Sequence, residues 1–244
     1  MSDSKYCINI KNITIPYGLS ESSKTKHIRI VIDMSGLRVV KPIKARMEDV
    51  DSFLKAKSGW IYKHHMRFSS IAADKFCRKW ESGETLLLTG ESYDIHMEYV
   101  KRHGITVMFN GKGFCIEAGG GIPEDEKKAL IEETVKAWYK KAAYGVIKDR
   151  LEHFCKLTGL KFNVFRIKDQ KTRWGSCSKK GNLNFNWRLV MAPLWVVDYV
   201  IVHELCHLEF LNHSSEFWDM VGSFMPGYKK AAEWLKKNGR SLNI

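Results

Sequence analysis

The sequence predicts an α+β fold in two parts, on the basis of three observations. Residues 1–120 are rich in short β-branched runs separated by polar turns. Residues 121–244 are dominated by helical periodicity, with a small sheet between the helices. Three consecutive glycines, Gly119 to Gly121, favour a turn or hinge between these parts. We therefore predict an N-terminal β-rich region over residues 1–120 and a second domain over residues 121–244, either separate or joined in one continuous body.

The N-terminal region is predicted as antiparallel strands with one long helix. Two strand-forming segments open it, YCINIKNITI and HIRIVIDMSGLRVV, and in the second Met34-Ser35-Gly36 separates two β-branched runs like a hairpin. From Met47 to about Phe68 the apolar residues follow helical spacing, with acidic residues early and basic residues late, as the helix dipole favours. Strands resume in TLLLTG, SYDIHMEY and GITVMFNGKGFCIEA, the last turning at Asn110-Gly111.

The second part begins with a helix that starts at Pro123 and stops at Gly159. Its predicted apolar stripe consists of Ile131, Val135, Trp138, Ala142 and Val146. A strand, KFNVFRI, and a hairpin, TRWGSCSKKGNLNFNWRLV, turning near Lys180-Gly181, follow it. Three helices complete the chain, with start and stop signals at Pro193, Ser214, Pro226-Gly227 and Gly239.

The composition limits the partners and the cellular location. No segment offers the roughly 18 apolar residues needed to cross a bilayer, and MSDSKYCINI lacks the features of a signal peptide, so we expect no membrane partner and a cytoplasmic location. Six cysteines stand singly, which favours reduced thiols. A net charge of +13 would attract nucleic acid, but the basic residues are spread along the chain without a nucleic-acid-binding motif, which favours a solvated basic surface.

The segment VIVHELCHLEFLNHSSEFW, residues 200–218, predicts a metal site. His203 and His207 are four residues apart on an apolar helix, so their rings share one face and can bind a single ion. Glu204 falls off that axis, where its carboxylate can take a proton from the water that the metal activates. His213 can complete the set if Asn212 ends the helix in a left-handed conformation. Three protein ligands leave one open position, as in catalytic zinc (Zn2+) sites.

Other interpretations of these residues are weighed against the metal site. A lone histidine on an apolar helix is more often a core residue that is hydrogen-bonded to a carbonyl, but the combination favours a ligand set. Glu216 and Glu233 are rival third ligands, and His213 is preferred because neutral imidazole suits zinc. Cys206 is interpreted as a small buried filler. The remaining histidines lack partners at ligand spacing and are interpreted as surface or local hydrogen-bonding groups: His64, His65, His96, His103 and His153.

The hairpin before the metal helix carries the predicted substrate-binding residues. Leu183 to Leu189, LNFNWRL, is the predicted edge strand along which a peptide could be added. In it, Asn184 and Asn186 alternate with apolar residues and would lie on the wet face, although a plain core hairpin fits the pattern equally well. Arg173 could bind a substrate carboxylate or phosphate or stabilise an oxyanion, with a structural ion pair as the alternative.

The segment from Thr172 to Trp218 closely resembles the YgjP-like metal-dependent hydrolase family, also called DUF45, which is classed among the zincin metallopeptidases. The H-E-x-x-H-x5-H-x3-F-W string is also similar to that of WLM and SprT-type proteases. The resemblance implies a zincin-like catalytic half in which His203, His207 and His213 bind the metal and Glu204 is the general base. The resemblance also implies an alternative activity, because a nucleoside-triphosphate pyrophosphatase activity, notably on UTP, has been assigned to a member of the family. Phe210 stands where metzincins have glycine, so the chain is not predicted to be one.

Three functions are predicted from these residues and from the resemblance. The leading prediction is a zinc-dependent peptidase that acts on a peptide substrate. The second is metal-dependent hydrolysis of a nucleotide, motivated by the basic balance and Arg173, although no Walker loop or carboxylate cluster for magnesium is evident. The third is a nucleic-acid-associated module whose metal site cleaves bound protein, which steeply salt-dependent DNA binding would support.

Overall fold

The chain divides into two compact units, Met1–Arg78 and Lys79–Ile244. The computed structural model describes residues 6–23, 25–33, 36–66 and 78–244. The predicted turn at Met34-Ser35, the predicted helix end near Phe68, and Cys77 lie outside the described residues. Within the described residues, no helix combines the length and apolar character needed to cross a bilayer.

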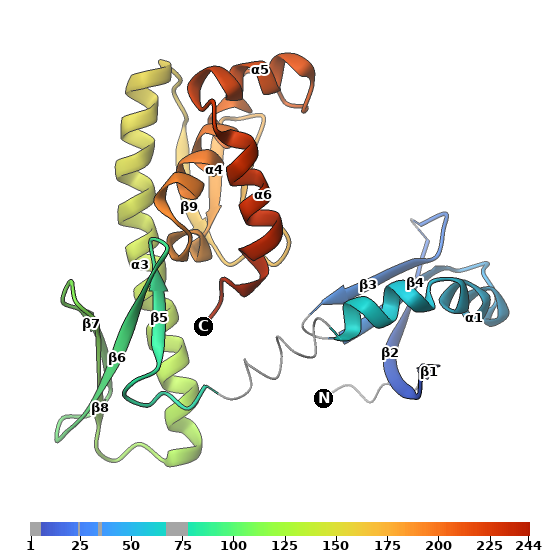
Figure 1. Ribbon diagram of the computed structural model, residues 1–244, viewed down its shortest axis with the longest axis horizontal. Coiled ribbons are helices and arrows are strands. Elements are labelled where there is room, and N and C mark those ends of the chain that lie inside the picture. Colours follow the sequence, from blue (N-terminus) through green and yellow to red (C-terminus); the bar gives the residue numbers. More distant parts are fainter. Residues whose placement is uncertain (1–5, 24, 34–35, 67–77) are drawn as a thin grey trace. The chain divides into compact units, whose positions relative to one another are not determined.

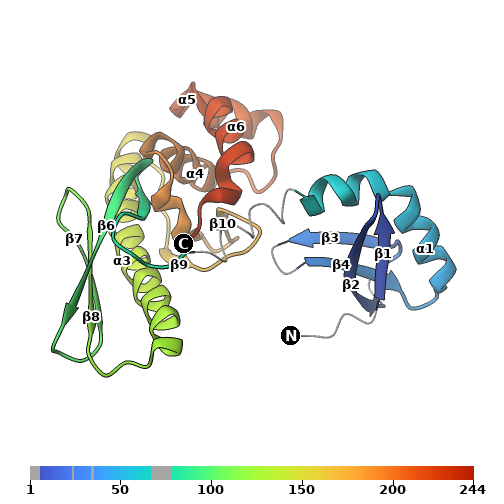
Figure 2. The same cartoon turned by 60° about the horizontal axis from the view of Figure 1, so that its bottom comes forward.

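The first unit is a four-stranded sheet with helix on one face (Figure 2). The strands β1 (Tyr6–Ile10), β2 (Ile13–Ser22), β3 (Arg29–Asp33) and β4 (Gly36–Pro42) lie in the order β1-β2-β4-β3. Helix α1 (Met47–Ala56) ends at a turn at Lys57, and residues 58–66 continue as a second helical segment, so the predicted long helix is interrupted. Both helical segments contribute to a core that the strands complete, made by Ile10, Ile15, Tyr17, Leu37, Val39, Val50, Leu54 and Ile61.

The second unit begins with a sheet of the same topology. Strands β5 (Thr85–Leu88), β6 (Glu91–Val100), β7 (Ile105–Phe109) and β8 (Phe114–Gly119) lie in the order β5-β6-β8-β7. In both sheets the outer pairs are antiparallel, whereas the central pairs, β2–β4 and β6–β8, are parallel. The prediction of antiparallel strands was therefore right only for the hairpins. Turn residues specify the partner of a strand within its hairpin, but they do not specify which strands of two hairpins lie side by side.

Helix α3 (Glu124–Thr158) runs along the second unit, with the β5–β8 sheet beside its first half and elements that follow it in the chain beside its second half (Figure 1). It begins after Pro123 and ends at Gly159, whose φ of 74° is the left-handed conformation that favours glycine. The predicted stripe is correct for two residues and then one residue out of step. The buried side chains are Ile131, Val135, Tyr139, Ala143, Ile147, Leu151 and Phe154, and Trp138 is only partly buried.

A four-residue step explains this winding stripe. Because each such step advances about 40° around the axis of a 3.6-residue helix, the buried face of α3 turns along its length. Its early part packs against the sheet, where the Tyr139 hydroxyl donates a 2.6 Å hydrogen bond to the carbonyl of Leu87. Its later part packs against α4 (Leu194–Cys206), where Arg150 binds both carboxylate oxygens of Asp198, at 2.6 and 2.9 Å. The long helix thus connects the sheet to the helix that carries the site.

The remaining elements surround α4. Strands β9 (Val164–Lys168), β10 (Gly175–Cys177) and β11 (Asn182–Asn186) form a sheet in the order β10-β11-β9, followed by the 3₁₀ helix η1 (Trp187–Met191). Helices α5 (Ser215–Phe224) and α6 (Tyr228–Asn238) follow α4, and a short η2 (Gly239–Ser241) ends the described helices. Gly239 begins η2 with φ of −57°, so the chain leaves α6 without the left-handed cap that the sequence suggested.

The β5–β6 turn contacts the start of α4, which explains why this sheet belongs to the second unit. The Thr89 and Gly90 amides donate to the carbonyls of Val190 and Met191 in η1, at 2.7 and 3.2 Å. A Cβ atom at Gly90, which has φ of +91°, would lie 2.8 Å from Pro193, the N-cap of α4. The sequence division at residue 120 separates these strands from the helix, whereas the contacts join them in one core.

Candidate metal centre

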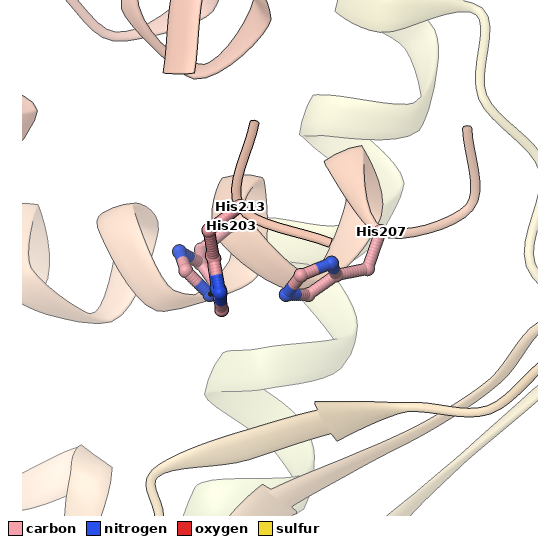
Figure 3. A group of neighbouring side chains, drawn as sticks. All are labelled: His203, His207 and His213. Carbon is pink, nitrogen blue, oxygen red and sulfur yellow. Dashed lines mark hydrogen bonds between the residues drawn. The ribbon is translucent and has the colours of Figure 1, made fainter. Parts of the chain in front are cut away.

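Three histidine rings converge at the end of α4 (Figure 3). His203 is in the last turn of the helix, His207 is its C-cap, and His213 comes from the following connection. One ligand nitrogen from each ring lies within 4.8 Å of the other two, and this is the group of potential metal-binding side chains found within the described residues. The ring centroids are 4.8 to 5.0 Å apart, so the three rings surround one small space.

The turn that brings His213 back differs from the predicted one. Helix α4 ends at Cys206, and the chain then tightens through hydrogen bonds from Leu208 to Leu205 and from Glu209 to Cys206. Asn212 is not among the described residues with positive φ, so it does not end the helix in a left-handed conformation. The helix can stop early because shorter-range backbone bonds satisfy its last carbonyls.

Neighbouring groups hold the rings in place. His207 Nδ1 lies 2.8 Å from the carbonyl of Phe210, which directs its other ring nitrogen towards the cluster. Helix α5 supplies two aromatic rings: Phe217 stacks on His207 at 4.6 Å, and Trp218 stacks on His213 at 5.5 Å. The sequence indicated these aromatic residues only as part of the family resemblance, because a contact across a turn has no periodic signal.

The protonation of the rings fits a metal. Burial, reinforced by the neighbouring His207 and His213, lowers the pKa of His203 to about 3. Burial and the nearby His207 also lower the pKa of His213. Such imidazoles are neutral at physiological pH, and neutral imidazole is the form that coordinates zinc. The Nε2 atoms of His203 and His213 are 3.1 Å apart, which is close enough for both to face one ion.

Glu204 is a buried carboxyl beside this cluster, with 5% of its surface exposed. Its Oε2 has no hydrogen-bond partner in the part of the chain that the structure describes. Burial raises the pKa of Glu204 to about 8, although the positive charge of the nearby Arg173 acts in the opposite direction. A buried carboxyl without a partner is costly, and a cation held by the adjacent histidines would reduce that cost. The residues present therefore fit a divalent metal.

Gly175 in β10 makes room for Glu204. A Cβ atom at this glycine would lie 2.5 Å from Oε1 and 2.6 Å from Cγ of Glu204. Contacts this short cannot be accommodated without moving one of the two residues, so the strand and the carboxyl fit only because position 175 lacks a side chain. Gly175 was not predicted as a site residue, since the contact joins residues that are far apart in the chain.

The two predicted asparagines have structural roles in this hairpin, and the predicted edge strand was wrong. Strand β11 is the central strand of its sheet, paired with β10 and β9. Asn186 is buried, and its side chain donates to the carbonyls of Gln170 and Arg173 and accepts from the Arg188 amide. The Asn184 amide donates to Ser176 Oγ at 3.3 Å. The alternation of apolar and polar residues along this strand indicated its buried face, but it could not show that a third strand pairs with β11.

Arg173 lies at the site, whereas the rival ligands lie outside it. Arg173 lines a pocket of about 390 Å³ together with His203 and Glu204, and it makes no ion pair with the described residues.

Glu216 and Glu233 are exposed and outside the metal-binding group, and Cys206 is fully buried, as its interpretation as a filler predicts. Among the other histidines, His96 pairs with Glu98 and His64 packs on Trp60.

Comparison with known proteins assigns the class of this protein. The family model of the YgjP-like metallopeptidase domain matches residues 26–238, which is most of the chain and reaches into both units. The match defines a metal-dependent hydrolase of the metallopeptidase type, for which a peptide is the implied substrate. The chain belongs to the YgjP-like family.

One solved structure is similar to part of the chain. It is the metallopeptidase zymogen abylysin of Pyrococcus abyssi, which is 30% identical, with the match covering 37% of this chain and 93% of that chain at a TM-score of 0.35. No curated protein matches the chain significantly.

Proposed function

We propose that this protein is a zinc-dependent peptidase in which His203, His207 and His213 hold the metal and Glu204 is the general base. The observation that carries the proposal is the convergence of three ligand nitrogens within 4.8 Å beside a buried carboxyl with an unpartnered oxygen. Three imidazoles would leave one position of a tetrahedral ion open, which is the coordination of catalytic zinc sites.

Each group at the site has its own part in the proposed reaction. Zinc bound at the three imidazoles would polarise the scissile carbonyl and lower the pKa of the attacking water. Glu204 accepts the proton of that water and returns it to the amine of the departing peptide. Gly175 leaves the space in which the carboxyl of Glu204 stands. Phe217 and Trp218 hold two of the imidazoles by stacking on them.

Strand β10 supports the same function, because it is an edge of its sheet and contains the glycine that contacts Glu204. An edge strand can bind an extended peptide through its backbone groups. We infer that β10, in place of the predicted Leu183 to Leu189, aligns the substrate beside the metal. Hydrolysis of nucleotides is less well supported, since the metal-binding group among the described residues contains only histidines and no carboxylate cluster for magnesium.

The Glu204→Gln variant tests the mechanism, with Glu209→Gln as its control. Glu209 is an exposed glutamate just beyond the helix. Both variants should retain wild-type zinc content by mass spectrometry. Loss of a general base typically costs about 10²- to 10⁴-fold, so Glu204→Gln should lose peptide cleavage by that factor, whereas Glu209→Gln should not.

The assay follows cleavage of a mixed peptide library and of nucleoside triphosphates in parallel. Wild-type turnover of peptides by Glu204→Gln would contradict the assigned base. Hydrolysis of the triphosphates with no peptide cleavage would contradict the peptidase and favour the second predicted activity.

A further inference from the structure

The pocket beside Glu204 offers more than room for a substrate. It is lined by α4, by the segment that leads into β10 and by α6, and its volume is about 390 Å³. His203 and Glu204 form part of its wall, so a group bound in it lies next to the proposed centre of cleavage. Given the proposed peptidase function, on which this inference rests, the lining of the pocket determines which peptides that centre accepts.

Two cationic side chains line this pocket from different elements. Arg173 comes from the segment before β10, and Lys236 comes from the last turns of α6. Neither is within ion-pair distance of a carboxylate among the described residues. The acidic residue in the lining is Glu204. Whether its carboxyl is protonated or ionised, the two cations give the pocket a net positive charge, even before the charge of a metal is added.

The rest of the wall is largely apolar. Trp174, Val200, Ala232 and Leu235 provide it. Trp174 is held against η2, where a Cβ atom at Gly239 would lie 2.7 Å from its ring. A hydrophobic wall with two cations suits a group that has an apolar stem and an anionic end.

We propose that this pocket binds the carboxylate of a peptide substrate and makes the enzyme selective for an acidic group near the scissile bond. That carboxylate can belong to an aspartate or glutamate side chain or to the C-terminus of the peptide. A phosphoryl group fits less well, because it carries more negative charge than a carboxylate and the C-terminal turns of α6, where the helix dipole is negative, form this wall. Arg173 can bind a planar carboxylate through two parallel hydrogen bonds, and Lys236 adds a point charge.

The test uses Arg173→Gln and Lys236→Gln, with Lys171→Gln and Lys237→Gln as matched controls. The control lysines are exposed neighbours in the chain that do not line the pocket. Substrates are peptides that differ at one position, which carries Glu, Gln, phosphoserine or Lys, each made with a free and with an amidated C-terminus. The free-acid and side-chain arms identify which carboxylate is bound.

The wild type should cleave the best carboxylate-bearing peptide about tenfold or more faster, in kcat/KM, than its amide counterpart. Each pocket variant should lower cleavage of the acidic peptides far more than cleavage of the neutral peptides, and so remove most of that preference, with zinc content close to wild type; the control variants should keep the preference. Equal cleavage of acid and amide peptides, or a preference for phosphoserine or lysine, would overturn the proposal. So would an equal loss on every peptide in the pocket variants.

A binding measurement separates this inference from the proposed catalysis. Zinc-loaded Glu204→Gln protein is titrated with the same labelled peptides, and anisotropy reports binding without turnover. Tighter binding of the acidic peptides, lost in the double variants with Arg173→Gln or Lys236→Gln, supports the pocket even if no peptide is cleaved. Binding that is indifferent to the carboxylate overturns the pocket even if the peptidase function stands.

Discussion

The hydrogen atom that stands in place of a side chain at residue 175 determines where Glu204 can lie. The carboxyl occupies the volume that a methyl group would need, at 2.5 Å from Oε1. The φ of Gly175 is not in the left-handed region, so space and not backbone freedom requires the glycine. A substitution there should displace Glu204, the proposed general base, while leaving the histidines in place.

We expect Gly175→Ala to lower kcat about tenfold or more, with KM and zinc content close to wild type, because a small displacement of a catalytic group is costly. Since the displaced carboxyl meets a different environment, the pH at which kcat is half-maximal should also shift. Gly145→Ala is the control, as a Cβ atom at that position of α3 meets open space. It should keep full activity and gain up to roughly 1 kcal/mol of stability. An alanine at residue 175 with unchanged kcat and pH profile would refute the role given to this glycine.

At this scale the sequence identified the histidines that converge, but not the groups that position them. His203 and His207 were recognisable from their spacing on an apolar helix, and their side chains do converge with His213. Gly175 was not recognisable as a neighbour of the site, and Phe217 was recognisable only through the family resemblance, because their contacts cross between elements. Asn186 matched a wet-face pattern, yet its side chain caps η1 from inside the protein.

Among the elements, β9, η1 and α3 meet at one carboxylate, that of Asp169. The Trp187 indole donates to it at 3.1 Å, Arg188 binds it at 2.5 Å, and Lys136 of α3 pairs with its other oxygen. Burial alone would raise the pKa of Asp169, but these three donors together hold it below the usual range. The network fixes the segment that leads into α4.

The sign of the effect of pH is set by that lowered pKa. The folded protein binds the Asp169 proton less readily than the unfolded chain, so the network stabilises the fold above the ordinary pKa of 3.8 and its contribution is lost as the pH falls below it. Asp169→Asn should lower the free energy of unfolding at pH 7 by about 1–2 kcal/mol, a low value because the carboxylate is partly exposed. The gap between variant and wild type should close below pH 4.

Urea denaturation followed by circular dichroism at several pH values measures this gap. The exposed Asp219 of α5 provides the control variant, Asp219→Asn, which should match the wild type throughout. A gap that stayed constant down to pH 2 would show that the charge of Asp169 does not stabilise the network.

Elements were predicted well where local signals decide them and poorly where partners decide them. Pro123 and Gly159 mark the ends of α3, and the hairpins turn where glycine and asparagine predict. The parallel pairs β2–β4 and β6–β8, and the central place of β11, depend on which surfaces meet after the strands have formed. The periodicity of one segment does not indicate which other strand it will pair with.

At the scale of the whole molecule, the described residues form two separate hydrophobic cores. One contains Val50 and Leu54 of the first unit, and the other contains α3, α4 and the elements around the histidines. All three histidines and Glu204 belong to the second unit. Metal binding should therefore stabilise only that unit.

We expect calorimetry to resolve two unfolding transitions, of which a chelator lowers one and added zinc restores it. Leu54→Ala should lower the other transition, since a buried Leu→Ala change costs about 2.7–5 kcal/mol, and should leave zinc content unchanged. The matched change in the second core, Leu151→Ala, should lower the zinc-sensitive transition. A single transition that responds to both treatments would show that the two cores unfold together.

The brevity of β10 has a consequence for how the protein behaves at high concentration. An edge strand offers its backbone groups to any extended chain, including a strand from another copy of the same protein, and so is a template for aggregation. With only three residues, Gly175–Cys177, β10 gives an incoming strand few bonds unless that strand is anchored elsewhere as well. A peptide held at the proposed metal centre would have such an anchor, whereas a second folded copy would pair through these three residues alone, so this edge could stay open without promoting intermolecular sheet growth.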